Sequence, residues 1–367
     1  MCVAADAAGA VAIVGGGPAG MALALALRQK GVASEIFEAR ERSVVRHDHR
    51  VLALSDGSRQ ILDWLGVWSG LPKTPIATIH VSQRGGFGRT VLQASEMDLP
   101  ALGWVVAASD LIAALDDAVT EHGIAYRDNQ SVSAADTAGF SLTAFAEGRI
   151  EPGAGSLRDY GQHAVLCNVE VADPHRNVAW ERFTGDGPLA LLPLGNRYSV
   201  VLTCADAVVE AVKALEDAPF LALLQQRFGS RHRFIAATPR VAYPLGLRYR
   251  PNPVAARQVW LGNAAQTLHP VAGQGFNLAL RDIWELAVAL AAAPDPGAPD
   301  VLASYARGRR ADRHGAIGFT DLLILGFATE FAPLRHLRGA GLLALDLLPS
   351  LRAFVAKRMI FGARAWP

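Results

Sequence analysis

The stretch from Val11 to Glu38 constrains the fold of this chain most strongly. A β-branched apolar run, VAIV, is followed by GGGPAG, which places Gly15, Gly17 and Gly20 in GxGxxG register. The next residues, MALALALRQKG, predict a helix closed by a glycine, and SEIFE predicts a second strand that ends in Glu38. A glycine motif in this complete strand–helix–strand setting predicts a dinucleotide-binding domain rather than an ordinary glycine-rich turn.

The residues of this motif have separate roles in nucleotide binding. Gly15 allows the tight turn, Gly17 lets the backbone approach a pyrophosphate, and Gly20 permits close packing of the helix on the strand. The free N–H groups at the helix start, around Ala19, attract phosphate oxygens. Glu38 can accept hydrogen bonds from an adenosine ribose. Because no second unit of this kind follows, we expect one permanently bound nucleotide rather than two in separate Rossmann domains.

Composition excludes several classes of partner. The 367 residues carry 35 basic and 34 acidic side chains, a formal net charge of +1, which gives no reason to expect nucleic acid. The three cysteines show no zinc-ligand spacing, so we expect neither a metal site nor a disulfide framework. The start of the chain lacks a basic segment followed by an apolar block, so a signal peptide is not expected. We therefore expect a cytoplasmic protein, with peripheral attachment to the inner face of the membrane as an alternative.

A second glycine-rich stretch, GNAAQTLHPVAGQGFNLALRD, runs from Gly262 to Asp282. RQVWLG before it predicts a strand, and the apolar residues after it follow one helical face: Phe276, Leu280, Ile283, Ala287 and Leu290. The helix is predicted to start near Gln274 or Gly275 and to end before Pro294. Its first N–H groups would then point at whatever the loop holds, and a reduced flavin gains negative charge that such groups stabilise.

This stretch resembles the second FAD motif of the single-component flavin aromatic hydroxylases, in which Gly-Asp precedes a Pro-x-x-Gly-Gln-Gly loop. The likeness is greatest with the ubiquinone-biosynthesis branch, and within it with the 2-polyprenyl-6-methoxyphenol hydroxylases. Further matches cover most of the chain, at residues 49–68, 179–194, 242–245 and 309–323.

The resemblance implies roles for individual positions. Arg50 would lie near the flavin or its phosphates. Asn263, after Gly262, stands where the wider family has an aspartate that touches the ribityl chain or the pyrophosphate, and we interpret it as a mark of the ubiquinone branch. The residues implied to lie along the isoalloxazine ring are Pro270, Gly273, Gln274 and Gly275, with Asn277 on the first helical turn.

His269 has two interpretations. Beside a flavin it could orient or deprotonate a phenol, because its reference pKa of roughly 6.5 is close to operating pH. Alternatively, it packs and forms hydrogen bonds within its own loop. We favour packing, since these hydroxylases need no obligatory side-chain base.

The resemblance and the strand patterns together predict an α/β fold with a Rossmann-like FAD-binding domain of the aromatic-hydroxylase type, an interleaved β-sheet substrate domain and a C-terminal helical segment. The FAD-binding domain would comprise residues 1–70, 105–158 and 255–325. The substrate domain would comprise residues 71–104 and 159–254, and the helical segment residues 326–367.

The implied activity is that of an FAD-dependent monooxygenase. It would hydroxylate a polyprenylated phenol in ubiquinone biosynthesis, with NAD(P)H as electron donor and O2, through a flavin C4a-hydroperoxide. One alternative is a flavin hydroxylase of another aromatic substrate. The other is a non-catalytic flavoprotein-fold scaffold subunit of a quinone-biosynthesis complex.

The C-terminal segment is basic and apolar. From Leu334 to Arg364 it holds five arginines and one lysine against a single acid, Asp346. Such a stretch suits an anionic membrane surface, where a prenylated substrate would reside. A helical cap that packs on the core or on a partner subunit is the equal alternative.

One departure from the family pattern bears on activity. The family carries a third fingerprint, a strand followed by Asp-Gly and then by a serine and an arginine. Gly153 to Arg158 match the tail of this fingerprint, but Pro152 stands in the place of the aspartate. We therefore expect the strand before it to be missing and the following helix to be cut short. The sequence leaves open a natural deletion, an edited sequence, or a segment closed up in the numbering.

Overall fold

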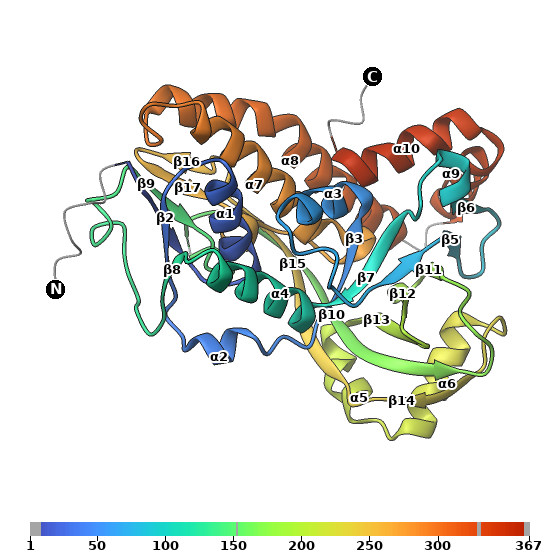
Figure 1. The fold of residues 1–367 in the computed structure, drawn as a ribbon. Helices are drawn as coiled ribbons and strands as arrows, with labels where there is room; N and C mark the ends of the chain where they lie inside the picture. Colours follow the sequence, from blue (N-terminus) through green and yellow to red (C-terminus); the bar gives the residue numbers. More distant parts are fainter. Residues whose placement is uncertain (1–8, 152, 329–331, 363–367) are drawn as a thin grey trace.

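The computed structural model describes residues 9–151, 153–328 and 332–362, which form two large sheets and a layer of helices (Figure 1). The six-stranded sheet lies on the left of Figure 1, the nine-stranded sheet on the right, and α7, α8 and α10 run across the top. The helices are α1 (Pro18–Gln29), α2 (Arg42–Val45), α3 (Asp56–Trp64), α4 (Ala108–Glu121), α5 (Val209–Ala214), α6 (Asp217–Phe228), α7 (Gln274–Ala291), α8 (Pro299–Ala328), α9 (Ala332–Leu347) and α10 (Pro349–Phe361).

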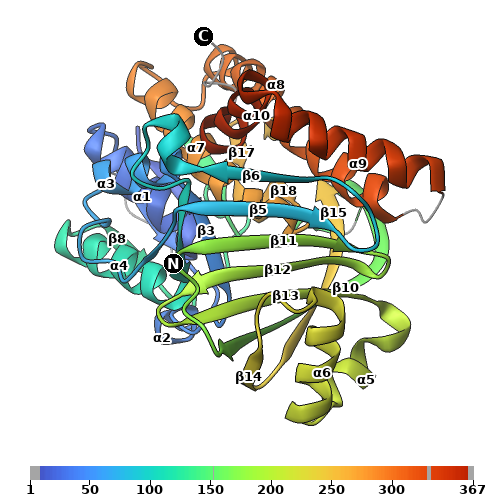
Figure 2. The ribbon, with the colours of Figure 1, turned by 90° about the vertical axis from the view of Figure 1, so that its right-hand side faces the viewer.

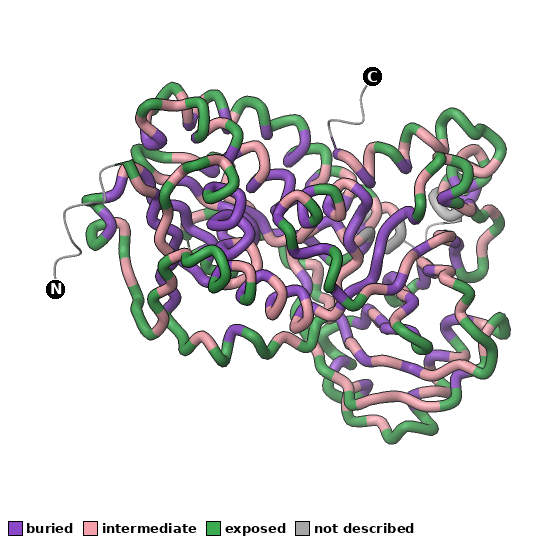
Figure 3. Tube along the Cα trace, viewed as in Figure 1, coloured by how far each residue is buried: buried purple, intermediate pink, exposed green. Residues whose placement is uncertain are grey.

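The six-stranded sheet holds the first glycine motif. Its order is β16 (Val254–Ala255), β17 (Gln258–Trp260), β9 (Leu142–Phe145), β1 (Val11–Val14), β2 (Ser34–Phe37) and β8 (Ala125–Arg127). The strands from β17 to β8 are parallel. All four residues of β1 are buried, as expected of a parallel strand covered on both faces. Figure 3 shows this buried centre in purple.

Different structures cover the two faces of this sheet. Val11 and Ile13 pack in one apolar cluster with residues of α1, α4 and α7. On the other face, Phe140 packs against the sheet, as do side chains of the irregular segment 128–141 to which it belongs. A helical layer therefore covers one face, and an extended chain segment covers the other.

The nine-stranded sheet forms most of the right half of the molecule. Its order is β18 (Gln266–Thr267), β15 (Val241–Tyr249), β10 (Ser156–Val171), β13 (Arg197–Ala205), β12 (Gly187–Leu194), β11 (Val178–Thr184), β5 (Thr78–Gln83) and β6 (Arg89–Gln93), while β14 (Phe234–Ala237) pairs with β10. Figure 2 shows these strands side by side, with α9 beside β6 and α6 beside β14. One face packs on α5 and α6. The other face packs on α8 and on the small sheet of β3 (Val51–Ser55), β7 (Gly103–Ala107) and β4 (Thr74–Ile76).

The expectation of a missing strand before Gly153 was wrong. β9 is present between β1 and β17, and it pairs with both in parallel register. It ends at Phe145, several residues before Pro152, so the proline does not interrupt it. The next element among the described residues is the long strand β10, which begins at Ser156. The strand was missed because it is only four residues long and contains a threonine, and because a long loop separates it from Ser156.

A buried ion cluster joins α7 to α8. Arg309 bonds through Nε to Asp282 Oδ1 at 2.6 Å and through Nη2 to Asp312 Oδ2 at 2.5 Å, while Arg281 Nε bonds to the same Asp312 oxygen at 2.8 Å. All four side chains are buried. Removing one partner would leave an uncompensated buried charge, so this cluster fixes the position of α7 relative to α8.

The C-terminal helices α9 and α10 form an elbow. Within the described ranges, no single helix is long and apolar enough to cross a membrane. The pair His336–Leu347 and Pro349–Phe361 meets that criterion of length and composition only jointly, and the two helices are bent by 99°.

Candidate active site

The glycine turn after β1 leaves open space at the start of α1. Gly15 has φ +110°, and a Cβ there would lie 2.6 Å from the Ala146 carbonyl carbon. A Cβ on Gly20 would collide with the Gly15 carbonyl oxygen, which explains the close helix–strand packing. Gly17 caps α1, and a Cβ there would meet nothing within 4 Å. The turn thus combines two packed glycines with one that faces open space beside free N–H groups, as pyrophosphate binding requires.

Glu38 follows β2 and faces this turn. Its Oε2 accepts the Gly16 N–H at 2.8 Å, and its Oε1 accepts Arg40 Nε–H at 2.8 Å. Burial opposes ionisation of Glu38, but the hydrogen bonds from Arg40 and Gly16 outweigh it and lower the pKa of the carboxyl. Glu38 is therefore an ionised acceptor beside the glycine turn.

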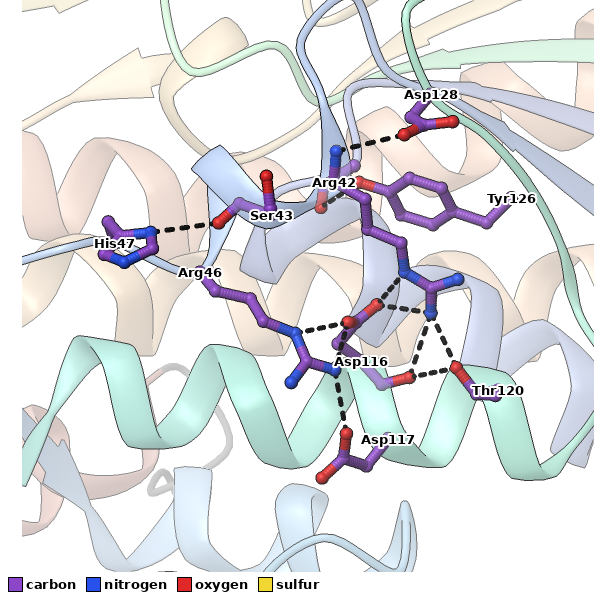
Figure 4. Close-up of polar contacts among 10 residues, drawn as sticks. Arg42, Ser43, Arg46, His47, Asp116, Asp117, Thr120, Tyr126 and Asp128 are labelled. Carbon is purple, nitrogen blue, oxygen red and sulfur yellow. Dashed lines mark hydrogen bonds and ion pairs between the residues drawn. The ribbon is translucent and has the colours of Figure 1, made fainter.

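The segment after Glu38 is clamped onto α4 (Figure 4). Arg42 Nε and Arg46 Nε bond to the two carboxylate oxygens of Asp116, at 2.6 and 2.7 Å. The Arg42 guanidinium also lies 4.5 Å from the ring centroid of Tyr126, whose hydroxyl donates to the Gly16 carbonyl at 3.2 Å. These two arginines therefore hold the segment after Glu38 against α4.

The second glycine-rich stretch meets the first at Gly262. This residue has φ +54°, and a Cβ there would lie 3.3 Å from the Ala19 Cβ at the start of α1. The Leu261 N–H donates to the Phe145 carbonyl at 2.9 Å, which ties the stretch to β9 as well. The Asn263 side chain is half-buried and makes no hydrogen bond to the described residues. The two motifs therefore form one continuous surface around the start of α1.

Residues 269–275, called here the flavin loop, lead into α7, which begins at Gln274 as predicted. Pro270 is exposed, and its carbonyl accepts the Gly273 N–H at 2.9 Å. Gly273 has φ +59°, and a Cβ there would lie 3.3 Å from the Ala53 Cβ. A Cβ on Gly275 would meet nothing within 4 Å. The loop is thus tight on the side of β3 and open at Gly275.

Asn277 holds the flavin loop to β3. Its Nδ2 donates to the carbonyl oxygens of Gly273 and Ala53, at 2.6 and 2.8 Å. Its Oδ1 accepts the Ser55 N–H at 2.9 Å and the Ser58 hydroxyl at 2.6 Å. Both ends of this buried amide are used within the protein, so its contribution to a ligand site is to fix the loop.

The other side of α7 faces the C-terminal helix. Gln274 Nε2 donates to the Met359 carbonyl of α10 at 3.2 Å. Gly57, at the start of α3, is close enough to α10 that a Cβ there would lie 2.9 Å from the Ile360 carbonyl oxygen. The end of α10 therefore closes over the start of α7.

His269 is buried, with 1% of its surface exposed. Its Nδ1 accepts the Val271 N–H at 3.1 Å, so in the neutral ring the proton is on Nε2. Burial lowers the pKa of His269 to about 4. Nε2 has no hydrogen-bond partner among the described residues. This state suits donation of a hydrogen bond to an oxygen atom, and it does not suit deprotonation of a phenol.

Arg50 lies immediately before β3. Its guanidinium forms an ion pair with Asp48, with Nη2 and Oδ2 2.5 Å apart. Asp48 and the nearby Tyr243 of β15 both raise the pKa of Arg50. The arginine is thus placed where the small sheet meets the nine-stranded sheet, and its charge is already shared with Asp48.

The structure adds Glu147, which the sequence analysis overlooked. Glu147 and Gly148 directly follow Ala146 at the end of β9, so an acid–glycine pair follows this strand, as in the family fingerprint. A Cβ on Gly15 would lie 2.8 Å from the Glu147 nitrogen, which places the pair against the first glycine turn. Burial and the nearby Glu151 raise the pKa of Glu147. In the sequence, this strand and its acid–glycine pair are visible in the stretch LTAFAEG, from Leu142 to Gly148.

Within residues 9–151, 153–328 and 332–362, no group of three or more histidine, cysteine, aspartate or glutamate side chains could hold a metal ion.

Comparison with known proteins identifies the family. The FAD binding domain family matches residues 9–158 and 152–320. The ubiquinone hydroxylase UbiL of Rhodospirillum rubrum is 34% identical over 97% of this chain and 90% of its own length. The 3-demethoxyubiquinol 3-hydroxylase of Escherichia coli K12 is 30% identical over 95% of this chain and 96% of its own length.

The alignment with the Rhodospirillum rubrum protein extends over 393 positions, more than the 367 residues of this chain, so that relative contains segments that this chain lacks. Among solved structures, p-nitrophenol 4-monooxygenase PnpA from Pseudomonas putida DLL-E4 shares the fold, with a TM-score of 0.73 at 17% identity over 97% of this chain and 98% of its own. The chain therefore belongs to the FAD binding domain family and is an FAD-dependent monooxygenase related to the ubiquinone-biosynthesis hydroxylases.

Proposed function

We propose that this enzyme hydroxylates a polyprenylated phenol in ubiquinone biosynthesis, with NAD(P)H as the electron donor and O2 as the oxidant. Two curated relatives named as ubiquinone-pathway hydroxylases align along nearly the whole chain. The structural observation that carries the proposal is the flavin loop. It is open at Gly275 and carries a buried, unpaired His269 Nε2, as a site for a ring system with a polar edge requires.

The residues present fit FAD. The open space at Gly17 and the free N–H groups at the start of α1 would take the pyrophosphate, and Glu38 would accept from the ribose. The unpaired Asn263 amide would contact the ribityl chain or the pyrophosphate. Gly275 leaves room for the ring, and the first N–H groups of α7 would stabilise negative charge on it. FAD, when bound, supplies the redox chemistry with O2.

The protein itself contributes orientation and exclusion of water. Phe183 of β11, Val271 of the flavin loop and Ile324 of α8 pack in one buried cluster beside the site. Such apolar cover keeps water away from the reacting atoms. The Nε2–H of His269 is positioned to donate a hydrogen bond to an oxygen of the ring or of the substrate.

We further propose that the elbow of α9 and α10 docks on a membrane surface. Large apolar side chains are 40–67% exposed at this elbow: Leu343, Leu347, Leu348, Leu351 and Phe354. The basic side chains contribute less to membrane binding than the sequence implied, because Arg352 is paired with Glu96. The apolar side chains are therefore the main membrane contact. α10 begins at the elbow and its last turn reaches Gln274, so a lipid-tailed substrate taken up at the elbow would pass along this helix to the flavin loop.

Rapid mixing of the purified holoenzyme with NAD(P)H tests the activity. The protein should be yellow, and a prenylated phenol should accelerate bleaching of the flavin absorbance. A yellow protein whose bleaching ignores prenylated phenols but responds to another aromatic compound would point to a hydroxylase of that compound. A colourless protein that takes up no FAD would leave the scaffold alternative.

A further inference from the structure

Several buried polar atoms are distributed over the face between the nine-stranded sheet and α8, and they have no hydrogen-bond partner among the described residues. They are Gln162 Oε1 of β10, Thr203 Oγ1 of β13, Glu181 Oε1 of β11, His269 Nε2 of the flavin loop and Thr320 Oγ1 of α8. Buried polar atoms in native proteins nearly always have a partner. Each such atom therefore marks a place where a polar ligand could supply the missing partner.

The alternation of side chains along the strands places the three sheet residues on the same face. Residues an odd number of positions away in the same strand pack against α5 and α6 on the opposite side of the sheet: Val165 and Cys167 for Gln162 of β10, Leu202 and Cys204 for Thr203 of β13, and Trp180 for Glu181 of β11. Because successive side chains of a strand point to opposite faces, Gln162, Thr203 and Glu181 point away from α5 and α6, toward the flavin-binding half.

Glu181 lies on this face between Ala179 and Phe183. Ala179, two residues before it, packs in a cluster with Ala53 of β3, the residue that the flavin loop approaches at its glycine. Phe183, two residues after it, packs with Val271 of the loop itself. Side chains at i−2, i and i+2 share a face, so Glu181 lies on the face of β11 that packs on β3 through Ala179 and on the flavin loop through Phe183.

The chemistry of this carboxyl favours one class of ligand group. No hydrogen bond or ion pair joins Glu181 to the described residues. Burial alone raises the pKa of Glu181 to about 7. A buried carboxylate without a cation is costly unless a donor reaches it. An O–H group is such a donor, and it brings no charge into the apolar surroundings.

We infer that Glu181 Oε1 accepts a hydrogen bond from the ring hydroxyl of the phenol substrate and thereby sets which ring carbon faces the flavin loop. This inference rests on the proposed function, since it takes the substrate to be a phenol. No covalent step is involved: the phenol O–H donates and the carboxylate accepts. Glu181 is thus a substrate-binding residue on the sheet.

A phenol and its methyl ether, which has no hydroxyl hydrogen to donate, test this contact. The FAD-loaded full chain is titrated with 2-geranylphenol and with its methyl ether, and binding is followed by the change in flavin absorbance. The wild type should bind the phenol at least about tenfold more tightly, because a hydrogen bond to a charged group has roughly that value. Glu181→Ala should bind the two ligands with affinities within about twofold of each other, since no acceptor remains.

Two further variants keep the test decisive. Glu210→Gln changes an exposed glutamate of α5 that, among the described residues, pairs with Lys213, and it should keep the wild-type preference. Glu181→Gln retains the shape of the side chain and a weaker acceptor, so it should show an intermediate preference for the phenol over its methyl ether. This variant also provides the test if the alanine variant fails to load FAD. A full preference for the phenol in either Glu181 variant would overturn the inference. Failure of the wild type to bind either ligand would instead overturn the phenol substrate class, and the inference with it.

Discussion

Gly262 lies directly against Ala19: a methyl group on Gly262 would be 3.3 Å from the Cβ of Ala19. The two residues belong to the two glycine-rich motifs at opposite ends of the region that matches the FAD binding domain. Their contact joins the space in front of α1 to the strand that leads into the flavin loop. We therefore expect nucleotide binding to depend on the contact between Gly262 and Ala19.

Replacing Gly262 with valine should damage both folding and flavin binding. The position has φ +54°, which disfavours a β-branched residue, and its side chain would press on Ala19. We expect a loss of about 2–3 kcal/mol in the free energy of unfolding, together with loss of bound FAD. Denaturant titration and the ratio of flavin to protein absorbance measure the two effects. Normal flavin content in this variant would show that nucleotide binding does not depend on the contact between Gly262 and Ala19.

Gly275→Val should separate flavin binding from folding. The new side chain would enter open space, so the free energy of unfolding of the apoprotein should change by less than about 1 kcal/mol. Flavin retention should fall sharply, because that space is where we place the ring. Gly308→Val, at an exposed glycine of α8 that also faces open space, is the matched control and should keep its flavin. Equal flavin content in the two variants would show that the ring lies elsewhere.

Asn277→Ala should destabilise the enzyme by about 2–4 kcal/mol, since it leaves the Ser55 N–H and the Gly273 and Ala53 carbonyls without their partner. The lost contacts also fix the flavin loop, so the affinity for FAD should fall. Thermal unfolding of the apoprotein and equilibrium dialysis against FAD measure these effects. Full stability in this variant would mean that the loop is held by other contacts.

The stability of the protein should depend on pH through Glu181. The folded pKa of about 7 is above the unfolded value of 4.5, so ionisation favours the unfolded state as the pH rises from 4.5 to 7. Glu181→Gln removes this cost. It should be more stable than the wild type by about 2 kcal/mol at pH 8, and the difference should vanish near pH 4.5. Denaturant titrations of both proteins at the two pH values measure this effect. A difference in stability that is the same at both pH values would show that the pKa of Glu181 is not raised by burial.

Membrane docking can be tested at the elbow. Changing Leu347 and Leu348 to serine should reduce sedimentation with anionic liposomes at least about tenfold, because each removes buried apolar area worth roughly 1–2 kcal/mol. Leu157→Ser alters a leucine of β10 with comparable exposure, 63% against 67% for Leu347, and should leave sedimentation unchanged. Equal sedimentation of all the variants would favour the alternative in which these helices only pack as a cap.

Short-range patterns in the sequence predicted the parts of the site that are local. The turn at Gly15, the start of α1 and the start of α7 at Gln274 depend on neighbouring residues, and the structure confirms them. The strand β9 was missed because four residues with one threonine give little periodic signal. The division into three domains remains a prediction.

Long-range partners were beyond the reach of the sequence. The side chain of Asn277 is committed to Ser55, which is 222 residues away, so its role in fixing the loop could not be inferred from its motif. Glu181 occupies an ordinary place in an alternating strand, and only the packing of Ala179 and Phe183 shows which face of the sheet it lies on.

The most direct test of the central claim is the fate of the oxygen atoms. The holoenzyme is supplied with NAD(P)H, a prenylated phenol and 18O2, and the product is analysed by mass spectrometry. We expect a product with one added hydroxyl group that contains a single 18O atom, formed in proportion to the NAD(P)H consumed. Consumption of NAD(P)H without a hydroxylated product, or a hydroxyl group that carries oxygen from water, would contradict it.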